Sequence, residues 1–425
     1  MSAIVQAVRA RLTSASGKML IATFLAAVVA RLGHLALAVL LARQVGPDGY
    51  GVFTFAVGLA TLGGQMSGLG WPTLMNRLIP GMLRDRDWPK LKGLVRAGDR
   101  VVLLSALAVA GLLVLIGESA PHLRLGLRLS ALLIVPFAFA ILRRQQLAAM
   151  RRAAIGLMFD QGIGAIIVAG IILIWGVGTV SDAVVQFALA TGLGLIVTTI
   201  MFRRRLPAET RAAPAAYSLR PWMVMALPMV VGLSSKLLMN KMDILLLAPL
   251  SNMHEVGLYG SAFRVTYLLT FPQVVLMTVV TPLLSQAFTN AQPQRVSRLL
   301  KGALIYALAT SVPVAAAILL FSDRIMTGVF GAEFAASAPI LVILTVGQVA
   351  ASLAIPFSAV LMMGGRERAF GGLNLAALGM NFALNLALVP GYGAWGSAVA
   401  TMISAISLLV GQVVLSRPIL AKGRS

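Results

Sequence analysis

Long apolar runs separated by short polar breaks extend along the whole chain. A helix needs about twenty apolar residues to cross the hydrocarbon core of a bilayer, and the breaks coincide with proline, glycine and clustered charges. The pattern predicts twelve membrane-crossing helices, at residues 19–43, 50–80, 100–118, 127–149, 155–177, 183–202, 221–249, 255–288, 301–321, 335–363, 370–389 and 394–416. Several exceed about 25 residues, which predicts tilt or kinks. The expected kink sites are Pro72, Pro228, Pro272, Pro282 and Pro356.

The composition is that of a membrane protein. Of the 425 residues, 59% are hydrophobic and 11% are charged, and the mean hydropathy is +0.91. A soluble domain is about half apolar and about a quarter charged. No polar stretch is long enough to fold separately, which excludes a secreted enzyme and a membrane-anchored soluble domain. We predict an all-α polytopic membrane protein whose first apolar run is a spanning helix and not a cleavable signal.

The excess of basic residues follows the predicted topology. A net charge of +22 would suggest nucleic acid as the partner of a soluble protein. With the N-terminus in the cytoplasm, 27 of the 35 basic residues lie on the cytoplasmic side, Arg143, Arg144, Arg151 and Arg152 among them. Four lie on the opposite side and four within spans. This distribution obeys the positive-inside rule, so we expect cytoplasmic termini and attribute the charge to topology and anionic lipid.

The two halves of the chain are weakly similar. The sequence VLLA at 39–42 and YGVF at 50–53 correspond to LLLA at 245–248 and VGLY at 256–259, an offset of 206 residues. Six spans separate the copies, and an even number preserves orientation, so the repeats are parallel. We expect an N-lobe over residues 1–205 with helices one to six, a basic cytoplasmic linker over 206–220, and a C-lobe over 221–425 with helices seven to twelve.

Two stretches resemble the polysaccharide-type flippases of the multidrug/oligosaccharidyl-lipid/polysaccharide (MOP) superfamily. The first, Leu40–Pro80, resembles the end of their first helix and their second helix, and the second, Asn381–Ser404, resembles their eleventh and twelfth helices. The residues that carry the second pattern are Asn381, Asn385, Pro390, Tyr392, Gly393, Gly396 and Ala400. The resemblance covers the whole length, including the helix number and the half-chain repeat.

The resemblance implies two six-helix lobes around a central cavity lined by helices one, two, seven and eight. It implies a flippase that moves isoprenoid-pyrophosphate-linked oligosaccharide from the cytoplasmic to the outer leaflet by alternating access. The related lipid II flippases usually carry two extra helices that this chain lacks, which favours O-antigen, capsule or exopolysaccharide repeat units as cargo. The implied location is the bacterial inner membrane, and the implied partners are the polyprenyl-pyrophosphate-linked oligosaccharide and the polysaccharide polymerase machinery.

Charges inside spans are the first candidates for a binding site, because an unpaired buried charge is costly. Arg31 lies near the middle of the first span, and Lys236 lies near the middle of the seventh, at a position equivalent to Ala30. Two cations at matching depths could face each other across a cleft and bind a pyrophosphate or an acidic sugar. The alternative is that helix carbonyls, Asn240 or water satisfy each cation and keep the cavity hydrated.

Lys241, Asp243 and Arg264 form a second charged set near the outer ends of helices seven and eight. Antiparallel neighbours bring Asp243 and Arg264 to similar depths, which predicts an ion pair. The other hypothesis is that Asp243 couples transport to a proton or Na⁺, since it is the only acid well inside a predicted span. Lys241 and Arg264 are expected to lower the pKa of this carboxyl, which would argue against proton carriage at neutral pH.

His34 and several amides are the remaining candidates. His34 follows Arg31 by one helical turn, which suits a proton-linked role or an ordinary interior hydrogen bond. Gln65, Asn240 and Gln273 could contact sugar hydroxyls, but amides also bridge helices. Asn381 and Asn385, four residues apart, are interpreted as bridging residues.

No motif for covalent chemistry is present. The chain has no cysteine, its three histidines are far apart, and no phosphate-binding loop occurs. We therefore expect no metal, no cofactor and no enzymatic activity. Two rivals remain: a multidrug or metabolite exporter of the same superfamily, working as an ion-coupled antiporter, and a membrane-embedded glycosyltransferase or polymerase. Cationic drugs need acidic cavities, whereas the candidate cavity charges well inside the spans are four cations against one acid, Asp243.

Overall fold

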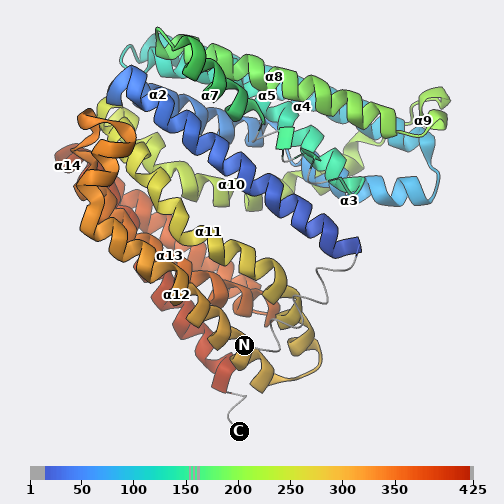
Figure 1. The fold of residues 1–425 in the computed structure, drawn as a ribbon. Coiled ribbons are helices and arrows are strands. Elements are labelled where there is room, and N and C mark those ends of the chain that lie inside the picture. The colour runs from blue at the N-terminus through green and yellow to red at the C-terminus, as the bar shows by residue number, and fades with distance from the viewer. Residues whose placement is uncertain (1–14, 153–154, 157, 160–162, 422–425) are drawn as a thin grey trace. The chain divides into compact units, whose positions relative to one another are not determined.

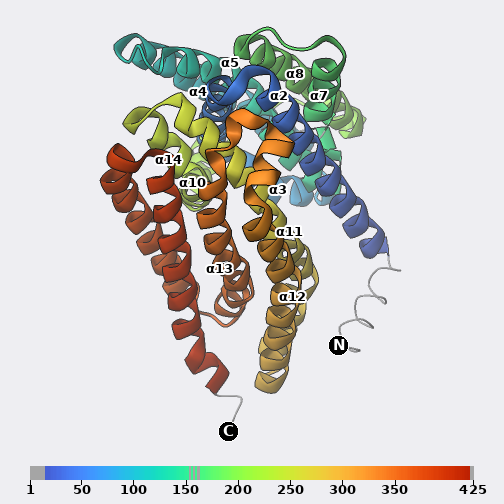
Figure 2. The ribbon, with the colours of Figure 1, turned by 60° about the vertical axis from the view of Figure 1, so that its left-hand side comes forward.

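The computed structural model describes residues 15–152, 155–156, 158–159 and 163–421, with side chains described outside 15–27, 231–237, 239–240 and 420–421. Every regular element in these ranges is helical (Figures 1 and 2). The first half holds α2 (Ala15–Ser67), α3 (Trp71–Arg84), α4 (Trp88–Ser119), α5 (Arg124–Ala149), α7 (Ile163–Trp175), α8 (Val180–Arg205) and α9 (Ala208–Ala212). The second holds α10 (Leu219–Leu250), α11 (Met253–Thr289), α12 (Pro293–Ile325), α13 (Ser337–Met363) and α14 (Glu367–Ala421), with a short π turn and a 3₁₀ turn between α12 and α13.

Two of these helices run across a predicted span boundary: α2 contains the first predicted span and the start of the second, and α14 contains the last two. The backbone of α2 leaves helical geometry at Gly46, with φ 65° and ψ −176°, and that of α14 does so at Gly393, with φ 53° and ψ −134°. Positive φ costs glycine little, so the chain breaks where the sequence placed its span boundaries. Eight described helices are long and apolar enough to cross a membrane, and shorter apolar segments lie at Ile163–Trp175 and Leu219–Val230. With both long helices divided, twelve segments result, and the predicted all-α polytopic fold is confirmed.

Two span predictions need correction. The span expected over 50–80 with a kink at Pro72 is instead two helices, because Leu69 and Gly70 adopt φ values of 45° and 77° between α2 and α3. The span expected from residue 100 begins at Trp88, where the Asp87 carboxylate accepts a hydrogen bond from the Lys90 backbone N–H at 3.2 Å. The Lys90 side chain, which also contacts Asp87, lowers the pKa of this half-buried carboxyl.

Residues 15–245 and residues 246–421 belong to two compact units. In the first, α5 packs against α2, α3, α4 and α8; in the second, α13 packs against α11, α12 and α14. The predicted repeat is visible in the helix starts, because α4 begins at Trp88 and α12 begins 205 residues later at Pro293. Most of α10 belongs to the first unit, whereas the sequence repeat assigns it to the C-lobe. The lobe boundaries at 205 and 221 therefore stay a prediction.

The segment between α8 and α10 is attached to the start of α4. The Lys92 ammonium donates to the carbonyl oxygens of Arg211 at 2.5 Å and Ala213 at 2.7 Å. The Ala216 N–H donates to the Pro89 carbonyl oxygen at 3.0 Å. A Cβ added at Gly93 would lie 1.8 Å from the Ala216 carbonyl oxygen. The basic linker predicted from sequence thus forms part of the packing of the first unit.

We expect Gly93→Ala to lower the free energy of unfolding by about 1–3 kcal/mol, because the added methyl must push the Ala216 backbone away from α4. Gly111→Ala on the same helix is the matched control, since a Cβ there meets nothing within 4 Å. Its higher helix propensity predicts unchanged or slightly raised stability. Thermal unfolding of the purified proteins in one detergent measures both. Equal midpoints for the two variants would contradict the close packing.

Candidate functional site

The first predicted cation, Arg31, lies in the first segment of α2 with an exposed side chain. His34 follows one turn later and is half-buried, with its ring centroid 6.3 Å from that of Phe187 on α8. Phe187 also contacts Phe53 and Phe137, at centroid distances of 5.8 and 6.0 Å. His34 is therefore placed against an aromatic cluster, one helical turn after the exposed Arg31.

Lys241 and Asp243 lie where α10 crosses the second segment of α2. A Cβ at Gly58 would be 3.9 Å from the Lys241 Cδ and 3.7 Å from the Ile244 Cγ2, so the absence of a side chain at Gly58 admits α10. The lysine is half-buried, and Asp243 is only 5% exposed. Lys241 and Asp243 are two residues apart on α10 and both belong to the first unit, and their roles in binding or ion coupling stay predictions. The Asp243–Arg264 ion pair stays a prediction.

Lys236 is helical in its backbone, and the side chains of Lys236 and Asn240 lie outside the described residues. The distance of Lys236 from the end of its helix can still be estimated from the backbone. Lys236 precedes the end of α10 at Leu250 by 14 residues, and Arg31 precedes the break at Gly46 by 15. At about 1.5 Å per residue, each cation lies roughly 21–23 Å along its helix from that end. The matching depths inferred from the repeat are consistent with these helix bounds.

The other predicted residues occupy different surroundings. Arg264 on α11 and Gln65 on α2 are half-buried. Gln273 is 1% exposed, and its amide contacts the Thr310 hydroxyl oxygen at 2.9 Å between α11 and α12. This contact is the helix-bridging role that amides also fill, and a sugar contact for Gln273 stays a prediction. In α14, the Ser397 hydroxyl donates to the Asn385 amide oxygen at 2.8 Å across the break, so Asn385 joins the two segments.

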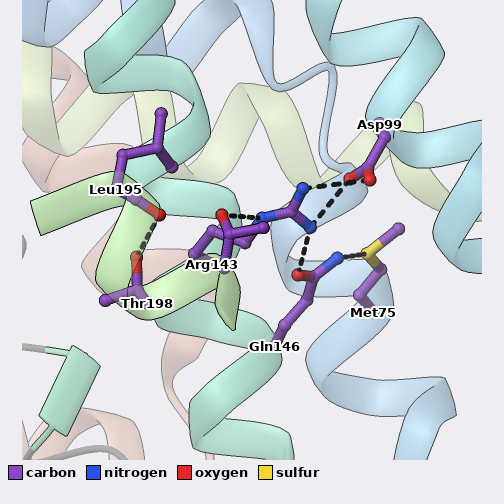
Figure 3. Close-up of polar contacts among 7 residues, drawn as sticks. Met75, Asp99, Arg143, Gln146, Leu195 and Thr198 are labelled. Atoms are coloured by element: carbon purple, nitrogen blue, oxygen red, sulfur yellow. Dashed lines mark hydrogen bonds and ion pairs between the residues drawn. The ribbon is translucent and has the colours of Figure 1, made fainter. Parts of the chain in front are cut away.

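A buried ion pair that sequence analysis missed lies in the first unit (Figure 3). Arg143 on α5 donates through Nη2 to Asp99 Oδ2 on α4 at 3.0 Å, and its Nη1 lies 2.9 Å from Asp99 Oδ1. The Arg143 side chain is 5% exposed and that of Asp99 is 26% exposed. Arg143 was counted with the loop cations because it lies near a predicted span end, but it is an interior residue. Asp99, just outside the span expected from residue 100, lies within α4.

The Arg143 guanidinium also contacts residues other than Asp99. Its Nη1 donates to the Gln146 amide oxygen at 2.7 Å, and its Nε donates to the Thr199 hydroxyl oxygen on α8 at 3.1 Å. The Gln146 amide nitrogen is 3.0 Å from the Met75 sulfur on α3. The guanidinium carbon lies 5.7 Å from the Phe139 ring centroid and 5.8 Å from that of Phe202. The network therefore joins α3, α4, α5 and α8, and its geometry is that of a structural clamp.

Trp71 joins α10 to the same unit. Its side chain is fully buried, its Nε1 lies 3.1 Å from the Met223 sulfur, and its ring meets Trp222 edge-on at 6.0 Å. Among the described residues no group of three histidines or acids is placed to hold a metal ion.

The fold is that of known membrane transporters. An inward-facing multidrug resistance MATE family transporter of the MOP superfamily superposes with a TM-score of 0.71, at 17% identity, over 93% of this chain and 95% of the other. The lipid II flippase MurJ in an inward closed conformation superposes with a TM-score of 0.72, at 15% identity, over 95% of this chain and 91% of the other. At these identities the likeness is one of fold. The protein is a polytopic membrane protein of the MOP fold.

Matches to protein-family models classify the chain more narrowly than its fold does. A model described as "Polysaccharide biosynthesis protein" matches residues 16–288, and the MatE model matches residues 228–387. The chain belongs to the polysaccharide biosynthesis protein family. It is 28% identical over 164 residues to the probable low-salt glycan biosynthesis flippase Agl15 of Haloferax volcanii. That match spans 38% of this chain and about a third (34%) of the relative. The family resemblance drawn from Leu40–Pro80 and Asn381–Ser404 is confirmed.

Proposed function

We propose that the protein is a flippase for an isoprenoid-pyrophosphate-linked oligosaccharide, moving the glycan headgroup from the cytoplasmic to the outer leaflet. The observation that carries the proposal is the family match over residues 16–288, which includes the helices that hold Arg31, Lys241 and Asp243. The name of the partly matching relative, a glycan biosynthesis flippase, supports the same cargo class. Within that class we propose O-antigen, capsule or exopolysaccharide repeat units, and transport without covalent chemistry.

The charges within the spans suit an anionic headgroup. Arg31, Lys236, Lys241 and Arg264 are basic, and Asp243 is the acid that the sequence analysis placed within a span. Cations on both α2 and α10 could hold a pyrophosphate while the lobes alternate between inward and outward access. His34, Gln65, Asn240 and Gln273 are the proposed contacts to sugar hydroxyls. The isoprenoid tail needs no binding charge because it stays in the bilayer.

We place the protein in the bacterial inner membrane with both termini in the cytoplasm, as the distribution of its Lys and Arg residues indicates. The polymerase that consumes the flipped repeat unit is the proposed partner on the outer side. A second candidate function is a multidrug or metabolite exporter working as an ion-coupled antiporter. It is favoured by the MatE match over residues 228–387 and by the MATE transporter fold. In that case Asp243 would bind the coupling ion.

Depleting the protein in its native cell distinguishes the flippase from the exporter. We expect a complete polyprenyl-pyrophosphate-linked repeat unit to accumulate while its polymer disappears, because the repeat unit is made in the cytoplasm and polymerised outside. Mass spectrometry of lipid-linked glycans measures the first and identifies the cargo; polymer staining measures the second. Re-expression of the wild-type chain is the control. Unchanged lipid-linked intermediates with a fall only in drug or metabolite efflux would establish the exporter instead.

A further inference from the structure

A groove between α11 and α12 in the second unit has a shape and charge that the proposed transport does not explain. Its volume is about 1040 Å³, and its lining residues come from α11, α12 and the turn that joins them. On α11 the wall is formed by Leu276, Val280 and Leu283, about one helical turn apart. These side chains belong to or pack against a buried apolar core of the unit. The floor of the groove is therefore apolar and is backed by this core.

One end of the groove is strongly basic. Arg295, Arg298 and Lys301 line it, and all three are exposed. They lie in the first three turns of α12, which begins at Pro293 and has no acid in its first turn. Neither α11 nor α12 contains an acidic residue between Val256 and Ser322. Three cations at the positive end of a helix dipole repel each other and the dipole, so a bound anion would relieve the repulsion.

The other end of the groove is apolar. On α12 the lining continues from Arg298 through Gly302 and Ile305 to Ala309, on one face of the helix. The distance from Arg295 to Ala309 along the helix is about 21 Å. A bilayer is about 40–45 Å thick when its headgroup regions are included, so one leaflet is about 20–22 Å thick. The groove therefore has about the length of one lipid molecule in a leaflet. The neighbouring surface of α12 is apolar and exposed, with Ile305 at 66% and Leu308 at 45%.

We propose that this groove is a binding site for an anionic phospholipid. The phosphate is held by Arg295, Arg298 and Lys301, and one acyl chain lies along the apolar wall toward Ala309. The positive-inside topology puts the basic end at the cytoplasmic surface, where anionic lipids attract basic residues. The three basic residues select an anionic headgroup by charge complementarity, and the length of the apolar wall selects a lipid over a free anion. The site is independent of the cargo of the transporter.

Native mass spectrometry of the delipidated full-length protein, titrated with phosphatidylglycerol or phosphatidylcholine, tests the proposal. We expect the wild-type protein to bind phosphatidylglycerol tightly and phosphatidylcholine weakly. The triple variant Arg295→Ala/Arg298→Ala/Lys301→Ala should bind phosphatidylglycerol about a hundredfold more weakly, because each basic residue contributes to headgroup attraction. The matched control is Arg203→Ala/Arg204→Ala/Arg205→Ala, which removes three exposed arginines from the last turn of α8. It should bind as the wild type does.

A second pair of variants tests the acyl chain. Ala309→Trp fills the apolar end without changing charge and should weaken phosphatidylglycerol binding, whereas Leu308→Trp, exposed beside the groove, should not. Both positions are exposed, so folding is preserved. Equal binding of phosphatidylcholine, displacement by inorganic phosphate at equal affinity, or tighter binding of polyprenyl phosphate at the same residues would each overturn the assignment. So would unchanged binding in the triple variant or in Ala309→Trp. None of these readouts depends on flipping.

Discussion

Arg143→Ala is expected to lower the free energy of unfolding by about 3–5 kcal/mol, the cost of removing one partner of a buried ion pair. The substitution leaves the Asp99 carboxylate without its guanidinium and removes the donors to Gln146 and Thr199. It also removes the cation from between the Phe139 and Phe202 rings. Because the network joins four helices, we expect a lower thermal midpoint in detergent and less protein in the membrane.

The same two helices supply the control. At the other end of α4 and α5, Glu118 and Arg128 form an ion pair at 2.6 Å whose side chains are about half exposed. Exposed pairs contribute little, so Arg128→Ala should leave the midpoint nearly unchanged. A double variant, Asp99→Asn/Arg143→Met, should be less damaging than the sum of its single changes, since neither charge is then left alone. A midpoint for Arg143→Ala equal to that of Arg128→Ala would refute the clamp.

The breaks in the helices could be predicted from the sequence because they depend on local chemistry. Gly46 precedes Pro47, and Gly393 follows Pro390 within an aromatic–glycine turn. Glycine at positive φ and proline after a helix end mark the same boundary whatever the surroundings. In the second case the Glu255 carboxylate accepts a hydrogen bond from the Ala394 N–H at 2.7 Å, which fixes a break that the sequence alone had located.

The buried ion pair could not be predicted in the same way. Asp99 and Arg143 are 44 residues apart, and only the packing of α4 on α5 brings them together. Two local signals were available: the Asp87 cap and Pro89 mark a helix start before residue 100, and Arg143 and Gln146 share a face of α5. The polar first turns of α4 resemble a loop when only hydropathy is read. For a helix that begins before its apolar run, hydropathy alone therefore predicts a start that is too late.

Removing Arg31 and Lys236 together is expected to abolish glycan export. If both cations hold one pyrophosphate, each charge-assisted interaction contributes about 1.5–3 kcal/mol, so the double variant should export roughly two to four orders of magnitude less repeat unit. The single variants should each retain partial activity. Arg31→Lys and Lys236→Arg keep the charge and should retain more than the alanine variants, with Arg31→Lys losing the bidentate geometry.

The measurement is the ratio of lipid-linked repeat unit to surface polymer in cells that carry each variant, corrected for the amount of inserted protein. Arg151→Ala/Arg152→Ala is the matched control, because it removes two exposed arginines just after the end of α5. Its export should equal that of the wild type. Intact export by Arg31→Ala/Lys236→Ala in properly inserted protein would rule out the cationic site. Loss of drug efflux in Asp243→Asn, with glycan export unchanged, would instead favour the ion-coupled exporter, since Asp243 is a buried acid on α10.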